Sequence, residues 1–377
     1  MSDEQIWVIQ TEDLQVGTVL CFDLTDASGV VLHKSGMPIS DRLKARLQKN
    51  GIHSVTIRGA AYFGADDAKS LLIGSYKSGS IEAMQELIAF SKLSLRKLAA
   101  RIEKNQELEL SELKGNVSDF VNQVSLDVAA TLATIVLQSK ESEAVAEMIM
   151  ERSIKLSVLS VVTSVVRGDT KEQSFKIGLA GLLHDCSLMT EKGISPDGYL
   201  RHPVSSAELV KGAFGISNDV LTMISQVHEQ TDGSGYPNQL TAKDSIDGAS
   251  ILNLVDAYLT LVEPMDGIGY VPSDAIAYLC YQAAQGRFSS KDMRAMLSCM
   301  SIYPVGSPVV LDDKAKAIVI EGNPGNPLEP TVRLFEPGNL SIELSNSNRN
   351  IAAPVYDRAQ NRFPKSKLHE ILWRTDR

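Results

Sequence analysis

Residues 181–237 constrain this chain most strongly, because they concentrate ionisable side chains that proteins use to bind metals. They contain three of the six histidines of the chain: His184, His202 and His228. Asp185 directly follows the first of them, and a further carboxylate, Asp256, lies inside the apolar run 251–259. An unpaired charge is costly to bury, so such an Asp needs a partner. Imidazole and carboxylate together suit divalent metals such as Fe, Mn and Zn.

Taken singly, each of these residues has a structural explanation, since one His beside one Asp is more often a surface or capping pair. Their order is more informative. A His-Asp pair is followed by His202-Pro203, then by His228 with Asp-Gly-Ser-Gly-Tyr-Pro at 232–237, and then by Asp256. This set resembles the HD-GYP family of bacterial metal-dependent phosphodiesterases, HD phosphohydrolases that open the signalling molecule cyclic di-GMP. The resemblance covers about half of the chain.

The resemblance implies a metal site and a recognition loop. Its metal ligands are His184, Asp185, His202, His228 and Asp256, and Asp185 is also the catalytic residue that bridges two metals. Its loop, tied in the family to partner recognition, comprises Asp232, Gly233, Gly235, Tyr236 and Pro237. From the residues alone we expect a rigid turn, because the two glycines permit positive φ and the proline fixes the exit.

Several positions depart from the family pattern. The imidazole expected on the preceding helix is replaced by Arg152, or by Ser153 in the neighbouring register. The first of two adjacent family histidines is Val227, and the Lys that faces the phosphate is Leu188. The remaining ligands could hold one metal, whereas two would need substitutes. Glu147 and Glu151 on the preceding helix are the nearest candidates.

The stretch after the His-rich region is acidic where the family carries cations for phosphate. No Lys or Arg occurs between Lys243 and Arg287, but the same interval contains six acidic residues: Asp244, Asp247, Asp256, Glu263, Asp266 and Asp274. Phosphate is normally bound by Arg or Lys. If the acidic run lines the pocket, we expect cyclic di-GMP to bind weakly. Leu188→Lys with Glu263→Arg would then improve binding.

We therefore interpret the chain as a signalling protein with a degenerate HD-GYP domain. It would act by binding a partner protein through the loop, or a cyclic dinucleotide, with little hydrolysis. It would hold one divalent metal (Fe, Mn or similar) or none. Two alternatives stay open: an active cyclic di-GMP phosphodiesterase with a reduced metal site, and an HD phosphohydrolase acting on a less anionic substrate.

Composition bounds the class of protein. The 377 residues are 44% hydrophobic and 22% charged, as in a soluble globular protein of two or more domains. The net charge of −9 argues against binding nucleic-acid polymers. We expect no membrane span and no secretory signal. The cysteines are scattered, which is typical of reduced thiols in a cytoplasmic protein: Cys21, Cys186, Cys280 and Cys299.

The patterns predict a mainly α fold, an HD-type helical bundle with a small N-terminal α/β module and a C-terminal β-appendage. The α/β module is expected over 1–75, with a helix capped by Ser40 and ended by Gly51. A helical connecting region over 76–143, with one long helix at 108–137 and a chance of homodimerisation, precedes the HD-GYP-like domain at 144–300. A β-hairpin piece and a polar tail follow over 301–377.

Overall fold

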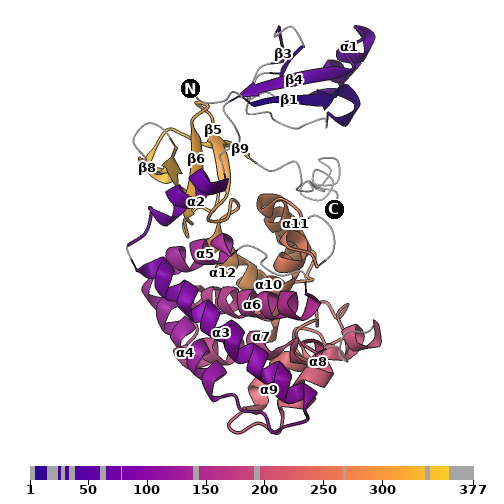
Figure 1. The fold of residues 1–377 in the computed structure, drawn as a ribbon, viewed down its shortest axis with the longest axis vertical. Helices are drawn as coiled ribbons and strands as arrows, with labels where there is room; N and C mark the ends of the chain where they lie inside the picture. Colours follow the sequence, from indigo (N-terminus) through magenta and orange to yellow (C-terminus); the bar gives the residue numbers. More distant parts are fainter. Residues whose placement is uncertain are drawn as a thin grey trace. The chain divides into compact units, whose positions relative to one another are not determined.

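The computed structural model describes residues 5–14, 24–26, 30–33, 39–59, 65–77, 79–138, 144–190, 196–265, 269–335 and 340–355. Contacts divide the chain into two units (Figure 1). Unit 1 comprises Met1–Ser75, Gly306–Ile320 and Glu329–Asp357, and unit 2 comprises Tyr76–Val305, Glu321–Leu328 and Arg358–Arg377. The predicted helical connecting region therefore belongs to the same unit as the histidine-rich region.

The N-terminal part of unit 1 is the predicted α/β module. Its four-stranded sheet has the order β1-β4-β2-β3. The elements are β1 (Gln5–Gln10), β2 (Leu24–Thr25), β3 (Val31–His33), α1 (Asp41–Lys49) and β4 (Ser54–Gly59). Ser40 caps α1 by accepting a hydrogen bond from the backbone N–H of Leu43, and Gly51 has φ +68°, as predicted.

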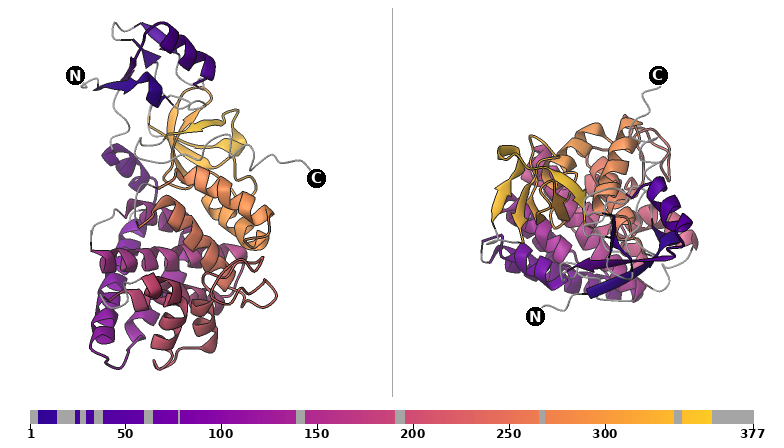
Figure 2. Two further views of the ribbon diagram at one scale, coloured as in Figure 1. Left: turned by 90° about the vertical axis from the view of Figure 1, so that its right-hand side faces the viewer. Right: turned by 90° about the horizontal axis from the view of Figure 1, so that it is seen from above.

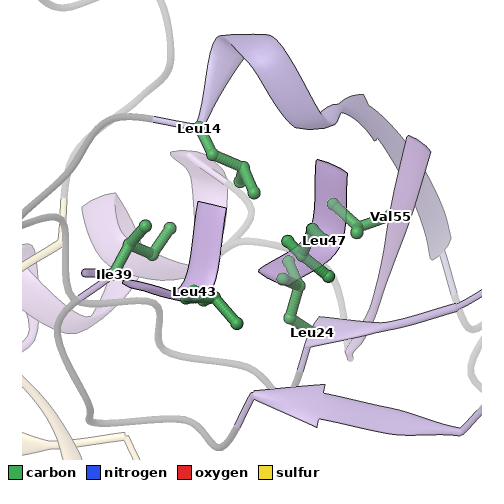
Figure 3. Close-up of a cluster of buried hydrophobic side chains, with 6 residues drawn as sticks. All are labelled: Leu14, Leu24, Ile39, Leu43, Leu47 and Val55. Carbon is green, nitrogen blue, oxygen red and sulfur yellow. The ribbon is translucent and has the colours of Figure 1, made fainter. Parts of the chain in front are cut away.

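One apolar face of α1 closes this module over the sheet (Figure 3). Leu43 and Leu47 of the helix meet Leu24 and Val55 of the strands, and Leu14 and Ile39 complete the cluster. The spacing of four residues between the two helix leucines places both on one side of α1. A short helix, α2 (Ala65–Ile73), follows in the chain.

The C-terminal strands form a second sheet, with the order β8-β7-β6-β5-β9. They are β5 (Pro308–Leu311), β6 (Lys316–Glu321), β7 (Thr331–Leu334), β8 (Ser341–Glu343) and β9 (Ile351–Pro354). The β-hairpin predicted in this region is present as β5 and β6, which pair antiparallel. Strands β8 and β9 extend the sheet beyond the predicted hairpin into the region expected to be a polar tail.

Unit 2 is helical. Its helices are α3 (Ser80–Glu103), α4 (Ser111–Leu126), α5 (Val128–Leu137), α6 (Val145–Arg167), α7 (Lys171–Leu183), α8 (Pro196–Val210), α9 (Asn218–Ser225), α10 (Ala249–Val262), α11 (Pro272–Ala284) and α12 (Ser290–Met300). The mainly α fold is thus confirmed. The single helix expected over 108–137 is two helices, because the Asp127 side chain accepts from the N–H of Ala130 and starts α5.

Helix α6 is the central element of unit 2 and contacts α3, α4, α5, α7, α10 and α12 (Figures 1 and 2). Its closest neighbour is α7. An added Cβ at Gly178 would meet Val161, and one at Gly181 would meet the backbone of Ser157. The Ser157 hydroxyl donates to the Gly178 carbonyl at 2.7 Å. Small residues on both helices therefore bring α6 against the helix that leads to the His-Asp pair.

Among the described residues, no single helix combines the length and apolar composition needed to cross a membrane. The bent pair α4 and α5 passes such a test only when both helices are counted together. Residues 130–135 of α5 are buried in the protein interior.

Candidate functional site

The structure brings five residues of the sequence prediction together in unit 2. We call them the histidine cluster: His184, Asp185, His202, His228 and Asp256. His184 ends α7, Asp185 follows it, His202 lies in α8, His228 follows α9, and Asp256 lies in α10. Four of them are at most 9% exposed, and the His228 side chain is 15% exposed. The segments after α7 and α9 therefore place Asp185 and His228 next to His202 of α8 and Asp256 of α10.

His184 and Asp185 form the deepest part of the cluster. The Nδ1 atom of His184 lies 2.8 Å from the Gly181 carbonyl oxygen, and its Nε2 lies 3.0 Å from Oδ2 of Asp185. Burial lowers the pKa of His184, but the Asp185 carboxylate more than offsets this and raises the pKa above its ordinary value. Burial would raise the pKa of Asp185, yet the surrounding imidazoles hold that pKa well below its usual range. The pair is therefore an ion pair, with an acceptor oxygen facing each ring nitrogen of His184.

His202 joins this pair to His228. Its Nδ1 lies 2.6 Å from the Tyr199 carbonyl oxygen, and its Nε2 lies 3.2 Å from Oδ1 of Asp185. The same Nε2 lies 2.8 Å from Nε2 of His228, so one imidazole donates to the other. Burial lowers the pKa of His228 to about 4, so this ring is neutral at pH 7.

Asp256 is held by Arg152 of α6. One terminal nitrogen of the guanidinium, Nη2, lies 2.6 Å from Oδ1 of Asp256, 2.9 Å from its carbonyl oxygen and 2.5 Å from Oγ1 of Thr260. Both charged side chains are only 13% exposed. Burial would raise the pKa of Asp256, but Arg152, followed by His228, lowers it. Arg152 thus neutralises the carboxylate that the resemblance assigns to a metal.

The contacts of α6 also distinguish between Arg152 and Ser153, the two residues considered as replacements of the family imidazole. Arg152 reaches the cluster, whereas the hydroxyl of Ser153 is buried with no hydrogen-bond partner among the described residues. Of the two residues considered for the place of the family imidazole, Arg152 is therefore the one that contacts the cluster. The sequence identified it as a lost ligand but missed its role as a cation. The available signal was an arginine in an apolar helix, which needs a buried counter-charge.

The donor types suit a divalent metal, but their arrangement does not. Within the residues that the structure describes, no group of three or more His, Cys, Asp or Glu side chains could hold a metal ion. Metal bonds to nitrogen or oxygen are about 2.0–2.2 Å long. Here the ring nitrogens and carboxylate oxygens instead contact one another, and Oδ1 of Asp256 contacts Arg152. Each of these contacts would have to open before an ion could enter.

The expected substitute ligands, Glu147 and Glu151, turn away from the cluster toward α3. Glu147 accepts two hydrogen bonds from Arg96, and Glu151 accepts one from Lys92. Arg96 lowers the pKa of Glu147, which is therefore ionised. The prediction that either residue supplies a missing ligand is wrong for this arrangement, because helix α3 offers each of them a cation.

Three of the six carboxylates in the acidic run after Lys243 pair with cations from α6, and one of the three is Asp256 with Arg152. Lys155 lies 2.6 Å from Glu263, and Arg167 lies 2.9 Å from Asp247. Both cations precede the run by many residues, so counting charges within 243–287 could not detect them. Asp274 is buried on α11, and Asp266 lies outside the described residues.

These contacts bear on the expectation that Leu188→Lys with Glu263→Arg would improve binding of cyclic di-GMP. Glu263→Arg would place a second cation beside Lys155. Leu188 is 2% exposed, so a lysine there would bring an ammonium group into the apolar interior. Val227, in the place of the other missing imidazole, is fully buried. The positions that depart from the family pattern are thus occupied by core side chains.

The loop that carries the Gly-Tyr-Pro sequence is held against the cluster by its backbone. Gly233 has φ +80°, as expected. Gly235 does not adopt positive φ, and its role is steric, since an added Cβ would collide with the backbone at 228–230. The buried carboxylate of Glu229 accepts hydrogen bonds from the N–H groups of Asn238 and Leu240. These contacts give the rigid turn that the sequence predicts.

Tyr236 places an aromatic ring directly over the cluster. Its ring stacks on His228 with centroids 4.8 Å apart and an interplanar angle of 18°. It is 37% exposed, so one side of the ring covers the imidazole while part of it faces solvent. Asp232 accepts hydrogen bonds from the N–H and hydroxyl of Ser234, and its carboxylate lies 3.8 Å from Arg287. The loop thus offers an exposed surface above a covered site.

Comparison with known proteins agrees with this geometry. Residues 137–291 match the family model described as HD domain. The chain contains an HD domain. The five residues of the histidine cluster and the helices α7 to α10 that position them all lie within the matched range. The HD-GYP resemblance inferred from the sequence is confirmed.

Two known proteins illustrate the relationship. The HD domain region is similar to the cyclic di-GMP phosphodiesterase PA4108 of Pseudomonas aeruginosa, with 29% identity over 171 residues. That match covers 42% of this chain and 41% of the relative. Among solved structures, Bd1817, an HD-GYP-type protein from Bdellovibrio bacteriovorus, is 14% identical with a TM-score of 0.48. The structural match covers 78% of this chain and 98% of Bd1817.

Proposed function

We propose that this chain is a cyclic di-GMP-type signalling protein whose HD domain acts by binding, with little or no hydrolysis of a cyclic dinucleotide. The observation that carries the proposal is the pairing of Arg152 with Asp256. A two-metal displacement needs metals that clamp the attacking and leaving oxygens. In this chain a guanidinium, which cannot activate water as a metal does, holds the carboxylate expected to bind one of them.

Binding of a protein partner through the Gly-Tyr-Pro loop fits the site better than binding of a dinucleotide beside Arg152. The space bordered by Arg152, Lys155 and Glu263 has a volume of about 20 Å³, which is room for about one water molecule. The surface of the loop remains accessible through Tyr236, and its shape is fixed by Glu229. A rigid exposed turn can contact a partner without losing much conformational entropy.

An active phosphodiesterase with a reduced metal site is the second candidate. The convergence of three imidazoles around Asp185 favours it, since these groups remain available if their mutual hydrogen bonds open. In that case His184, His202 and His228 would bind one ion beside Asp185. The ion would polarise a bound water. The residues would have to rearrange, because as described they do not fit a metal.

Hydrolysis of cyclic di-GMP by the full chain, measured with added Mn²⁺ or Fe²⁺, separates the two candidates. The binding proposal expects turnover near the background of Asp185→Ala, which removes the central carboxylate. Asp244→Ala is the matched control, because Asp244 is exposed and lies outside the cluster. Robust turnover by the native chain that Asp185→Ala abolishes and Asp244→Ala retains would establish the second candidate.

A further inference from the structure

A larger cavity lies in unit 2 between α3, α6 and the end of α5, lined by none of the five residues of the histidine cluster. We call it the side cavity. Its volume is about 520 Å³, which falls in the range of about 300–1,000 Å³ typical of small-molecule sites. It is therefore far roomier than the space beside Arg152, and Figure 1 shows the three helices that surround it.

One part of the wall of the side cavity is apolar. Ile88 and Leu93 of α3, Ile135 of α5 and Ile154 of α6 contribute to it. Three of these side chains are buried, whereas Leu93 is 50% exposed. An exposed leucine at the edge of an apolar wall leaves hydrophobic area in contact with water. A bound alkyl or aromatic group would remove that area from water, which is favourable.

The charged part of the wall is dominated by cations. Lys92, Arg96 and Lys155 line the side cavity, against one carboxylate, Glu151. Two further carboxylates pair with these cations from positions that do not line it. Glu147 lies 2.7 Å from Arg96 and 3.4 Å from Lys92, and Glu263 lies 2.6 Å from Lys155. Each cation is thus paired, but two of the three carboxylates lie outside the wall, so the polar groups that line the cavity are mainly N–H donors.

Arg96 is best placed to bind an added anion. It donates from Nε and Nη2 to Glu147, and a guanidinium has five N–H donors in all. Its side chain is 50% exposed, so the existing pair with Glu147 is weakened by solvent. Lys92 is one turn away on the same helix. An anionic group could bind beside these two side chains while its apolar part lies against Leu93 and Ile154.

We infer that the side cavity is a binding site for a small amphipathic anion, with an apolar body and one carboxylate or phosphate group. The site is separate from the proposed function of the histidine cluster. Its recognition comes from charge complementarity at Arg96 and Lys92 together with the apolar wall. Carboxylate and phosphate groups both accept charge-assisted hydrogen bonds from such side chains, so titration with each head group distinguishes them.

The test is a calorimetric titration of the full chain with decanoate and with monodecyl phosphate, each below its micelle concentration. The matched probe is decyltrimethylammonium, which has the same alkyl chain and the opposite charge. We expect saturable binding of one anion per chain, at least tenfold tighter than the cation. Whichever anion binds more tightly identifies the head group. No saturable binding of either anion, or equal binding of the cation, would overturn the inference.

Two substitutions and one control locate the site. Arg96→Gln is expected to weaken anion binding about tenfold, because it removes the charge at an exposed position without disturbing the core. Ala89→Trp, at an exposed residue of the cavity wall, is expected to weaken binding at least tenfold by occupying part of the cavity. Lys97→Gln is the control, since Lys97 lies on the same helix, pairs with Glu112 and does not line the cavity. Equal weakening by Lys97→Gln and Arg96→Gln would show a general charge effect and contradict the proposed site.

Discussion

The two halves of the histidine cluster differ in what balances their buried carboxylates. Asp185 is surrounded by imidazoles, as the family pattern implies, and its carboxylate raises the pKa of His184 beside it. Asp256 is instead met by the guanidinium of Arg152. The imidazoles around Asp185 could lose a proton and bind a metal ion. Arg152 beside Asp256 keeps its positive charge and cannot bind one. The two carboxylates of one cluster therefore differ in charge balance because one of them faces an arginine of α6.

The largest effect is expected at the Arg152–Asp256 pair. Asp256→Ala leaves the guanidinium buried without its counter-charge, which typically costs about 3–5 kcal/mol of unfolding free energy. Denaturant unfolding measures this value. Arg152→Met in the same chain should recover most of the loss, because both charges are then absent. If the double variant is as unstable as Asp256→Ala alone, the pair does not stabilise the site in this way.

A smaller effect is expected in the other half of the cluster. Asp185→Asn keeps an acceptor for one imidazole but removes the negative charge, and we expect a loss of about 1–3 kcal/mol. The same variant should lower the pKa of His184, since Asp185 is what raises it. Unfolding and NMR titration of the imidazole give both values. An unchanged His184 pKa in Asp185→Asn would refute the ion pair.

The two rings on either side of His202 should titrate differently. The folded pKa of His228, about 4, lies below the ordinary value of 6.5. Its neutral form therefore stabilises the fold fully above pH 6.5, and this contribution is lost as pH falls toward 4. His184 has a raised folded pKa, so its contribution is present below pH 6.5 and is lost as pH rises through that raised value. NMR spectra between pH 4 and 8 should show His184 charged while His228 is neutral. The reverse order would contradict the assignment.

The least pronounced change is expected in metal content. Arg152→His removes the internal cation and restores an imidazole beside Asp256, so it should raise the bound metal by up to one equivalent per chain. Arg152→Lys is the matched control, because it keeps the positive charge. Equilibrium dialysis against Mn²⁺ with elemental analysis gives the stoichiometry. Equal metal content in the two variants would show that charge at this position does not govern metal entry.

Local signals in the sequence predicted much of the architecture. The cap at Ser40 and the positive φ of Gly51 both follow from residues adjacent in the chain or one turn apart. The convergence of the cluster followed from a resemblance carried by motifs. The break at Asp127 was missed, because an N-cap inside an apolar run competes with the helical periodicity on both sides.

Charge pairing between distant segments could not be predicted in the same way. Lys155 and Glu263 are separated by 108 residues, as are Arg152 and Thr260. A local count of acidic residues therefore overstated the negative charge near the cluster. Glu147 and Glu151 appeared available as ligands for the same reason, since their partners on α3 lie more than 50 residues earlier. Such pairs depend on tertiary packing.

Elemental analysis of the native chain, purified without chelators, measures whether Arg152 stands in for a metal. If Arg152 takes the place of a metal beside Asp256, each chain should contain at most one equivalent of Fe, Mn or Zn. Two tightly bound metals per chain would contradict the account, because both halves of the histidine cluster would then have to act as ligands.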